Sequence, residues 1–153
     1  MIDNDKKNLR EKLLGIQQCL KAPKGQTNKF GGYSYRSAED ILNAVKPLLN
    51  EFRCTLVIHD DVVLVGDRVY VKATATIADC DSEDFISAQA FAREAVTKKG
   101  MDEAQITGSA SSYSRKYALN GLLAIDDTKD PDSTNNHDKK SPVTKSAQLV
   151  QSF

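Results

Sequence analysis

Hydrophobic residues recur with the period of an α-helix in three parts of the chain. The first part, residues 5–21, places a leucine-rich stripe opposite a mainly charged face that carries Lys6, Lys7, Arg10, Glu11 and Lys12. This pattern ends at Pro23 and Gly25, because both residues interrupt helices. Ser37 is placed to cap a second helix, whose stripe is formed by Ile41, Leu42, Val45, Leu48, Leu49 and Phe52. Pro47 lies inside this stripe and predicts a kink or an early change of direction.

The third helical stretch, residues 105–121, combines small, aromatic and basic residues. Asp102 and Glu103 precede it and are expected to cap its N-terminus. An apolar stripe is predicted at Ile106, Ala110, Tyr113 and Tyr117, with Ser109, Ser112 and Lys116 on a neighbouring face. Small residues allow close approach to the helix backbone, and a cation one turn away can hold an anion. The stretch therefore fits either a tight helix crossing with a solvated basic pair or a ligand site.

Between residues 53 and 96 the hydrophobic period changes to two, which predicts β-strands. We expect strands over residues 54–65, 68–78 and 84–96, with Gly66-Asp67 forming a tight hairpin between the first two. In the second strand Val69, Val71, Ala73, Ala75 and Ile77 alternate with polar residues. The simplest arrangement is a three-stranded antiparallel meander whose alanine-rich face is covered by a helix. The predicted fold class is therefore α+β.

The segment from Pro23 to Arg36 is expected to begin as a loop and to become extended after Gly31-Gly32. Tyr33 and Tyr35 alternate with polar residues there, so both rings should face one side of a strand. Aromatic rings next to Lys29 and Arg36 are typical of a surface on which bases stack and phosphates are held. The alternative is an edge strand whose tyrosines pack on the core.

Charge and cysteine content narrow the class of protein. The formal net charge of the 153-residue chain is +0, from 21 basic and 21 acidic residues, which argues against binding by overall charge. The charge is nevertheless segregated, because Lys24, Lys29 and Arg36 share a stretch without acids. Three widely spaced cysteines without a signal peptide indicate a reducing cytoplasm. No apolar run is long enough to span a membrane.

The composition changes sharply after Ile125, where Asp, Asn, Ser, Lys and Pro become frequent. We therefore expect residues 1–126 to form one domain and residues 127–153 to form a flexible tail with a short apolar tip. The tip, Gln148–Phe153, is either a docking peptide for a host replication protein or a terminus without a function.

The sequence contains no motif for nucleotide hydrolysis or nucleophilic catalysis. It lacks a Walker lysine loop, and its two histidines, His59 and His137, are isolated from other catalytic or zinc-binding residues. Acids at positions 60–61, 79–83 and 126–127 could in principle hold magnesium, but each group is expected at a turn or strand end, where acids are solvated. We therefore expect no cofactor and no metal.

Two blocks of the chain resemble the Erf family of phage single-strand annealing proteins. They are KFGGYSYRSAEDILNAVKPLL (residues 29–49) and TGSASSYSRKYALNGLLAIDD (residues 107–127), separated by the three-strand region. The resemblance runs from about the first helix to Asp127. It implies a β-β-β-α core like that of eukaryotic annealing proteins, with DNA in a groove between the sheet hairpin and the lower helices.

The resemblance also implies a recombination mediator that binds single-stranded DNA and anneals complementary strands without ATP. Such a protein acts as an oligomer, either a ring or a helical filament, and carries out no covalent step, so it is not an enzyme. The implied partners are single-stranded DNA, the annealed duplex intermediate and further copies of the chain. A host single-strand-binding protein is a further candidate partner.

The expected DNA-binding residues combine this resemblance with the basic and aromatic pattern. The helix after the meander is implied to contribute Arg115 and Lys116, with Ser112 nearby; Ser112 and Tyr113 stand where a more basic helix is expected. The full predicted set is Lys29, Tyr33, Tyr35, Arg36, Arg93, Lys98, Lys99, Ser112, Arg115 and Lys116. Three rival functions remain: a passive single-stranded DNA coat protein, a magnesium-dependent nuclease using the acidic groups, and a scaffold whose basic loops bind acidic proteins.

Overall fold

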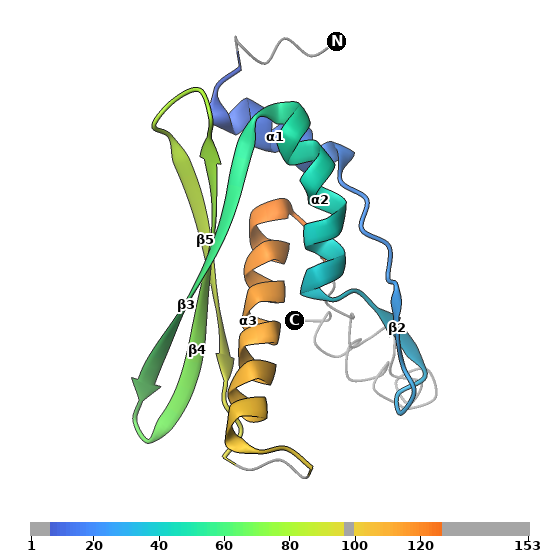
Figure 1. Ribbon diagram of the computed structural model, residues 1–153, viewed down its shortest axis with the longest axis vertical. Helices are drawn as coiled ribbons and strands as arrows, with labels where there is room; N and C mark the ends of the chain where they lie inside the picture. Colours follow the sequence, from blue (N-terminus) through green and yellow to red (C-terminus); the bar gives the residue numbers. More distant parts are fainter. Residues whose placement is uncertain (1–6, 97–99, 127–153) are drawn as a thin grey trace, which may run out of the picture.

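A computed structural model describes residues 7–96 and 100–126 of the chain. The elements in order are α1 (Leu9–Cys19), β1 (Gln26–Asn28), β2 (Tyr33–Tyr35), α2 (Ala38–Phe52), β3 (Cys54–Val65), β4 (Arg68–Asp79), β5 (Phe85–Arg93) and α3 (Glu103–Leu123). Figure 1 shows the long sheet of β3, β4 and β5 on one side of α3, and the short β1–β2 hairpin on the other side. Helices α1 and α2 cover one end of this arrangement. The predicted α+β class is confirmed.

Strands β3, β4 and β5 form the predicted antiparallel meander. β3 pairs with β4 from Cys54↔Asp79 to Val65↔Arg68, and β4 pairs with β5 from Tyr70↔Arg93 to Ala78↔Phe85. Gly66 has φ +62° in the turn between β3 and β4, a backbone conformation that glycine adopts without steric cost. The predicted hairpin is thus confirmed, whereas the third strand is shorter than the expected 84–96.

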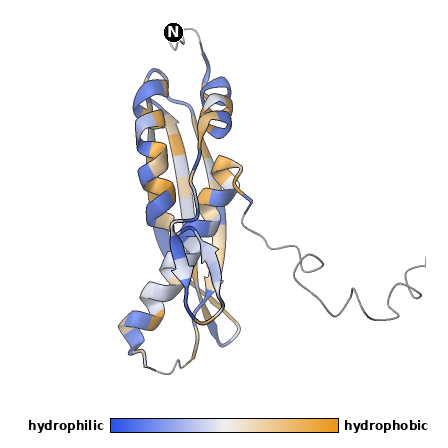
Figure 2. Cartoon of the chain, turned by 90° about the vertical axis from the view of Figure 1, so that its right-hand side faces the viewer, coloured by the Kyte–Doolittle hydropathy of each residue, from blue (hydrophilic) through white to orange (hydrophobic). Residues whose placement is uncertain are grey.

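The inner face of the sheet is built from small residues, and α3 packs directly on it. Ala73 and Ala75 of β4 are fully buried, and the Cβ of Ala88 on β5 would lie 3.9 Å from a Cβ added to Gly121 of α3. Such small side chains let the helix backbone come close to the strands. The core continues between α1 and α2 through Leu9, Leu13, Ile16, Ile41, Val45 and Phe52. Figure 2 shows hydrophobic and hydrophilic bands alternating along the helices, as the sequence pattern predicts.

Each helix begins with a capping box, in which the N-cap side chain and the side chain three residues later exchange hydrogen bonds with the backbone. The N-caps are Asn8, Ser37 and Asp102. The capping roles predicted for Ser37 and Asp102 are therefore confirmed. Helix α2 continues past Pro47 to Phe52, so the proline does not end it. Helix α3 extends beyond the expected end near residue 121 and stops at Leu123.

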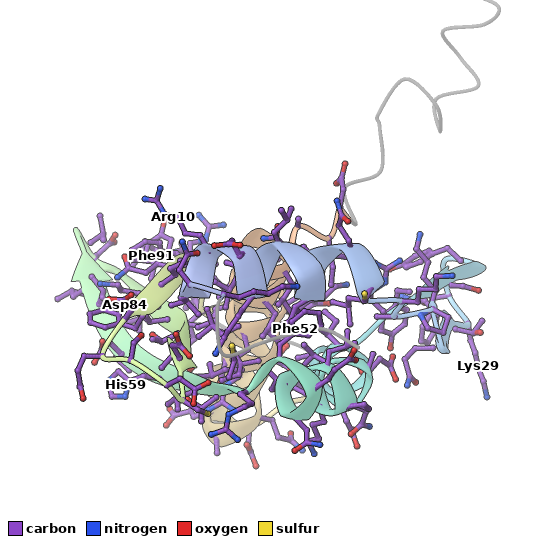
Figure 3. All side chains as sticks on the ribbon, turned by 90° about the horizontal axis from the view of Figure 1, so that it is seen from above. Arg10, Lys29, Phe52, His59, Asp84 and Phe91 are labelled. Atoms are coloured by element: carbon purple, nitrogen blue, oxygen red, sulfur yellow. The ribbon has the colours of Figure 1, made fainter. Side chains whose placement is uncertain are left out.

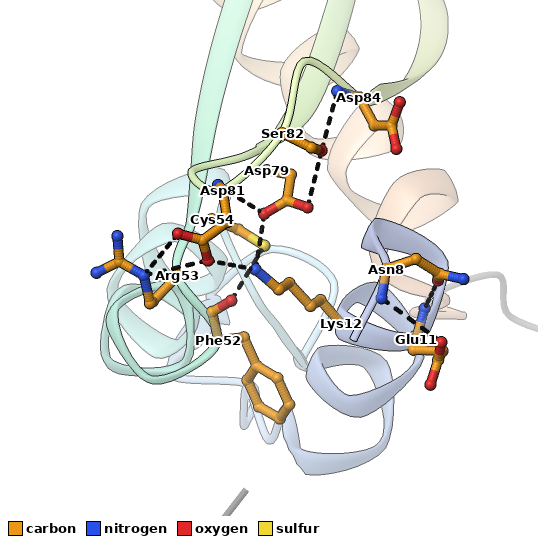
Figure 4. Close-up of polar contacts among 10 residues, drawn as sticks. All are labelled: Asn8, Glu11, Lys12, Phe52, Arg53, Cys54, Asp79, Asp81, Ser82 and Asp84. Atoms are coloured by element: carbon orange, nitrogen blue, oxygen red, sulfur yellow. Dashed lines mark hydrogen bonds and ion pairs between the residues drawn. The ribbon is translucent and has the colours of Figure 1, made fainter. Parts of the chain in front are cut away.

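Lys12 was expected on the mainly charged face opposite the leucine-rich stripe of the first helix, but its side chain is buried and 0% exposed. Its Nζ lies 2.7 Å from Asp79 Oδ1 and 2.9 Å from Asp81 Oδ2, and Arg53 contacts Asp81 at 3.1 Å (Figure 4). This ion-pair cluster joins α1 to the turn between β4 and β5 and to the C-terminal end of α2. Burial also raises the pKa of the neighbouring Cys54 thiol to about 11, which keeps the thiol neutral.

Part of the sequence prediction lies outside the described residues. This part comprises Lys98 and Lys99 and the expected tail at residues 127–153. Among the helices that the structure describes, none has the length and apolar character that crossing a bilayer requires.

Candidate functional site

A groove of about 770 Å³ separates the β1–β2 hairpin from α3. Its walls are Lys24, Asn28 and residues 33–38 on the hairpin side, and seven residues of α3 on the other side: Gln105, Gly108, Ser109, Ser112, Tyr113, Lys116 and Tyr117. Lys24, Arg36 and Lys116 give this lining three basic side chains, and none of the described lining residues is acidic. The side chains that line the groove are therefore predominantly basic, although the whole chain has a formal net charge of +0.

The hairpin wall begins with a strand that the sequence pattern did not reveal. β1 pairs antiparallel with β2 from Gln26↔Tyr35 to Asn28↔Tyr33, where a loop was expected. The three residues of β1 are all polar, so no hydrophobic alternation marks them. Asn28 holds the turn, because its Oδ1 accepts hydrogen bonds from the backbone N–H groups of Phe30 and Gly31 at 2.9 and 3.0 Å. Asn28, with Gly31-Gly32 three residues further on, was the available signal for this turn.

The hairpin tyrosines face the groove and not the core. Tyr33 and Tyr35 are 38% and 36% exposed, so the alternative of core packing is wrong. Their ring centroids lie 6.2 Å apart with planes tilted by 59°. Asn28 Nδ2 donates to the Tyr33 hydroxyl at 2.9 Å, and a Cβ added to Gly31 would lie 2.3 Å from the Tyr33 ring. Gly31 is thus required for the position of Tyr33.

Lys116 connects the two walls of the groove. Its Nζ lies 5.6 Å from the centroid of the Tyr35 ring, a cation–π arrangement. Ser109, Ser112 and Lys116 all line the groove. The prediction that these three residues share one face of α3 is therefore confirmed.

The apolar stripe predicted on α3 is wrong in its second half. Ile106 and Ala110 are buried as expected, but the buried row continues through Ser114 and Ala118. Tyr113 and Tyr117 are 53% and 51% exposed and border the groove. The physical reason is the alanine-rich sheet, which lets α3 approach closely, so that the small residues Ser114 and Ala118 occupy the contact. The tyrosine rings extend past the edge of that contact.

Arg115 and Lys116 are adjacent in sequence but lie on different faces of α3. Arg115 Nη2 lies 3.0 Å from Asp60 Oδ2, and the Ser111 hydroxyl donates to the same carboxylate. Asp60 was expected at a turn or strand end, but it lies in the middle of β3. Arg115 is therefore directed towards the sheet and is not among the residues that line the groove.

A second, smaller hollow of about 360 Å³ lies on the other side of the α3 tyrosines. Arg93 and Phe91 line it from β5, and Ser109, Tyr113 and Tyr117 border both this hollow and the groove. The tyrosine rings thus form the ridge between the two hollows.

Figure 3 shows Lys29 at the outer end of the hairpin, pointing away from the rest of the molecule.

The structure therefore brings together one part of the predicted DNA-binding set and separates another. Tyr33, Tyr35, Arg36, Ser112 and Lys116 share the groove. Arg93 lies in the adjacent hollow, whereas Lys29 and Arg115 lie outside both. Sequence reasoning missed Lys24 as a groove residue, although it belongs to the same acid-free stretch as Lys29 and Arg36.

Several of the acids considered for magnesium are engaged in ion pairs, and Asp127 lies outside the described residues. Asp79 and Asp81 contact Lys12, and Asp60 contacts Arg115. Within residues 7–96 and 100–126, no group of three or more His, Cys, Asp or Glu side chains is arranged to hold a metal ion.

The fold and the groove define a small α+β protein whose basic, tyrosine-lined groove lies between a hairpin and the helix that follows a β-meander. The family model described as the ERF superfamily matches residues 9–152, so the chain belongs to this family. It is similar to the "Essential recombination function protein" of Salmonella phage P22, with 58% identity over 127 residues. The alignment covers 83% of this chain but 60% of that relative, so this chain spans less than two thirds of its length. No solved structure matches the chain.

Proposed function

We propose that this protein binds single-stranded DNA and anneals complementary strands without ATP, as part of phage homologous recombination. Membership of the ERF superfamily and the similarity to a phage protein named for recombination support a role in recombination. The observation that carries the molecular activity is the groove, which combines three basic side chains with four tyrosines and lacks acids among its described lining residues. Basic grooves lined by aromatic rings are the common solution for binding single strands without sequence preference.

The chemistry of the groove explains how annealing proceeds. Lys24, Arg36 and Lys116 hold phosphates, which gives sequence-independent and salt-sensitive binding. Tyrosine rings stack on the faces of bases and leave their hydrogen-bonding edges free for a second strand. Watson–Crick pairing then supplies the specificity. No bond is made or broken, so the activity needs no nucleotide, metal or other cofactor, and the protein is not an enzyme.

Oligomers, either rings or helical filaments, strengthen this binding. One groove holds only a short stretch of DNA, and linked copies convert weak contacts into a firm grip on an extended strand. Lys29, Arg93, Lys98, Lys99 and Arg115 remain proposed DNA contacts outside the groove. A host single-strand-binding protein is a proposed additional partner, and the host cytoplasm is the proposed site of action.

The direct test is the rate at which two complementary labelled oligonucleotides form duplex without ATP. We expect the wild-type protein to accelerate annealing and Lys116→Ala to slow it, because Lys116 is a cation of the groove. The matched control is Lys46→Ala, which removes an exposed lysine of α2 that does not line the groove.

The alternatives give different results in the same assay. Binding without acceleration identifies a passive coat protein, and shortening of the strands with Mg²⁺ identifies a nuclease. Failure of the wild-type protein to bind oligonucleotide even at low salt contradicts the proposal and favours a scaffold that binds acidic proteins.

A further inference from the structure

We infer that Tyr113 and Tyr117 of α3 are the principal base-stacking residues of the groove, ahead of the hairpin tyrosines Tyr33 and Tyr35. This inference rests on the proposed binding of single-stranded DNA and says which wall of the groove receives the bases. The bases lie against α3, and the hairpin serves mainly to position cations and close the groove.

The geometry of the α3 pair suits successive bases of one strand. Tyr113 and Tyr117 are four residues apart, so their side chains project from the same side of the helix one turn apart. Their ring centroids lie 6.5 Å apart, and their planes differ by 18°. Near-parallel rings that repeat along a groove present matching faces to bases that follow one another in a strand.

Both rings are also accessible from two sides. Tyr113 and Tyr117 border the groove and the smaller hollow next to β5, so they form a ridge with open space on either side. About half of each side chain is exposed, whereas the buried row of α3 runs through Ser114 and Ala118. Exposed aromatic rings of this kind contribute little to the core, so they can be replaced without loss of the fold.

The hairpin tyrosines Tyr33 and Tyr35, in contrast, already make contacts within the protein. The Tyr33 ring lies against Gly31, and its hydroxyl is held by Asn28. Lys116 lies over the Tyr35 ring. The two rings are tilted by 59° and therefore do not offer parallel faces to successive bases.

A comparison of two probes isolates stacking from phosphate contact. One probe is an oligo-dT strand, and the other is an abasic strand of the same length, which keeps the phosphates but has no bases to stack. The chain contains five tyrosines and no tryptophan, so quenching of the wild-type tyrosine fluorescence by oligo-dT is a supporting readout of stacking. Three double variants are compared with the wild type: Tyr113→Leu/Tyr117→Leu, Tyr113→Phe/Tyr117→Phe and Tyr33→Leu/Tyr35→Leu.

We expect the wild type to bind oligo-dT at least about five-fold more tightly than the abasic strand, because stacking adds affinity for each base held. Tyr113→Leu/Tyr117→Leu should lose most of this preference, yet keep its affinity for the abasic strand. Tyr113→Phe/Tyr117→Phe should retain the preference, since phenylalanine keeps the ring. Tyr33→Leu/Tyr35→Leu should retain most of it, and circular dichroism should confirm that every variant is folded.

Two results overturn the inference and leave the proposed function standing. One is equal wild-type affinity for the two probes, and the other is a greater loss of preference in the hairpin variant than in the α3 variant. Wild-type protein that binds neither probe overturns the proposed function and the inference together.

Discussion

At the scale of single residues, the most informative side chain is Lys12. Burial alone lowers the pKa of a lysine, but hydrogen bonds from Lys12 to Asp79 and Asp81 outweigh burial and raise its pKa above the usual value. The pKa of Asp79 is lowered, because hydrogen bonds from Lys12, Ser82 and the backbone of Asp81 exceed the opposing effect of burial. The buried charges are thus satisfied by one another, which is the condition under which such charges are tolerated.

We predict that Lys12→Met lowers the free energy of unfolding by about 3 kcal/mol near neutral pH, because it leaves the buried Asp79 carboxylate without its cation. The loss is near the low end for a broken buried pair, since Ser82 and the backbone of Asp81 still donate to Asp79. Urea denaturation of the two proteins measures the difference. Lys46→Met, at an exposed lysine of α2, is the control and should change stability by less than about 0.5 kcal/mol.

The pH dependence gives the same prediction a second readout. The depressed pKa of Asp79 stabilises the fold above about pH 4, and this contribution is lost as pH falls through its folded pKa. The raised pKa of Lys12 stabilises the fold below about pH 10.5, and this contribution is lost as pH rises through its folded pKa. The difference between wild type and Lys12→Met should therefore be largest between these limits and shrink in acid. A difference that is independent of pH contradicts the ion-pair explanation.

At the scale of elements, local signals predicted most of the fold, and tertiary contacts decided the rest. The period-two pattern of β4 and the capping residues Ser37 and Asp102 located elements within a few residues, because these signals act within one segment. Strand β1 was missed because its residues are polar and its pairing with β2 depends on the Asn28 turn. The tyrosines of α3 were misplaced because helical period fixes a face but does not show how closely the sheet approaches it.

Replacing two helical glycines by alanine should change the stability of the protein in opposite directions. A Cβ added to Gly15 of α1 would lie 2.4 Å from the buried Phe52 ring, whereas a Cβ added to Gly108 of α3 meets nothing within 4 Å. Gly108→Ala should raise stability by about 0.5–1 kcal/mol, since alanine loses less backbone entropy in a helix. Gly15→Ala should lower it by about 1–3 kcal/mol, because overpacking exceeds that gain. Thermal unfolding of both variants measures the signs, and equal stabilisation by both contradicts the packing described for α1 and α2.

At the scale of the whole molecule, folding creates a charge distribution that the composition hides. The chain is neutral overall, yet residues 24–38 and 105–117 meet across a groove that has three cations and no acid among its described lining residues. Sequence reasoning identified both segments as candidates for DNA contact. It could not separate Lys116 from Arg115, because the pairing of Arg115 with Asp60 joins residues 55 positions apart in the chain. Such long-range pairing has no local signature.

The central claim is that single-stranded DNA lies in the groove between the hairpin and α3. The most direct measurement is ultraviolet cross-linking of an oligonucleotide that carries 4-thiothymidine, followed by mapping of the cross-linked peptides. We predict cross-links in the segments that contain Tyr33, Tyr35, Tyr113 and Tyr117. Cross-links confined to the outer face of the sheet, around His59, Thr74 and Gln89, with none in these segments, would contradict the account.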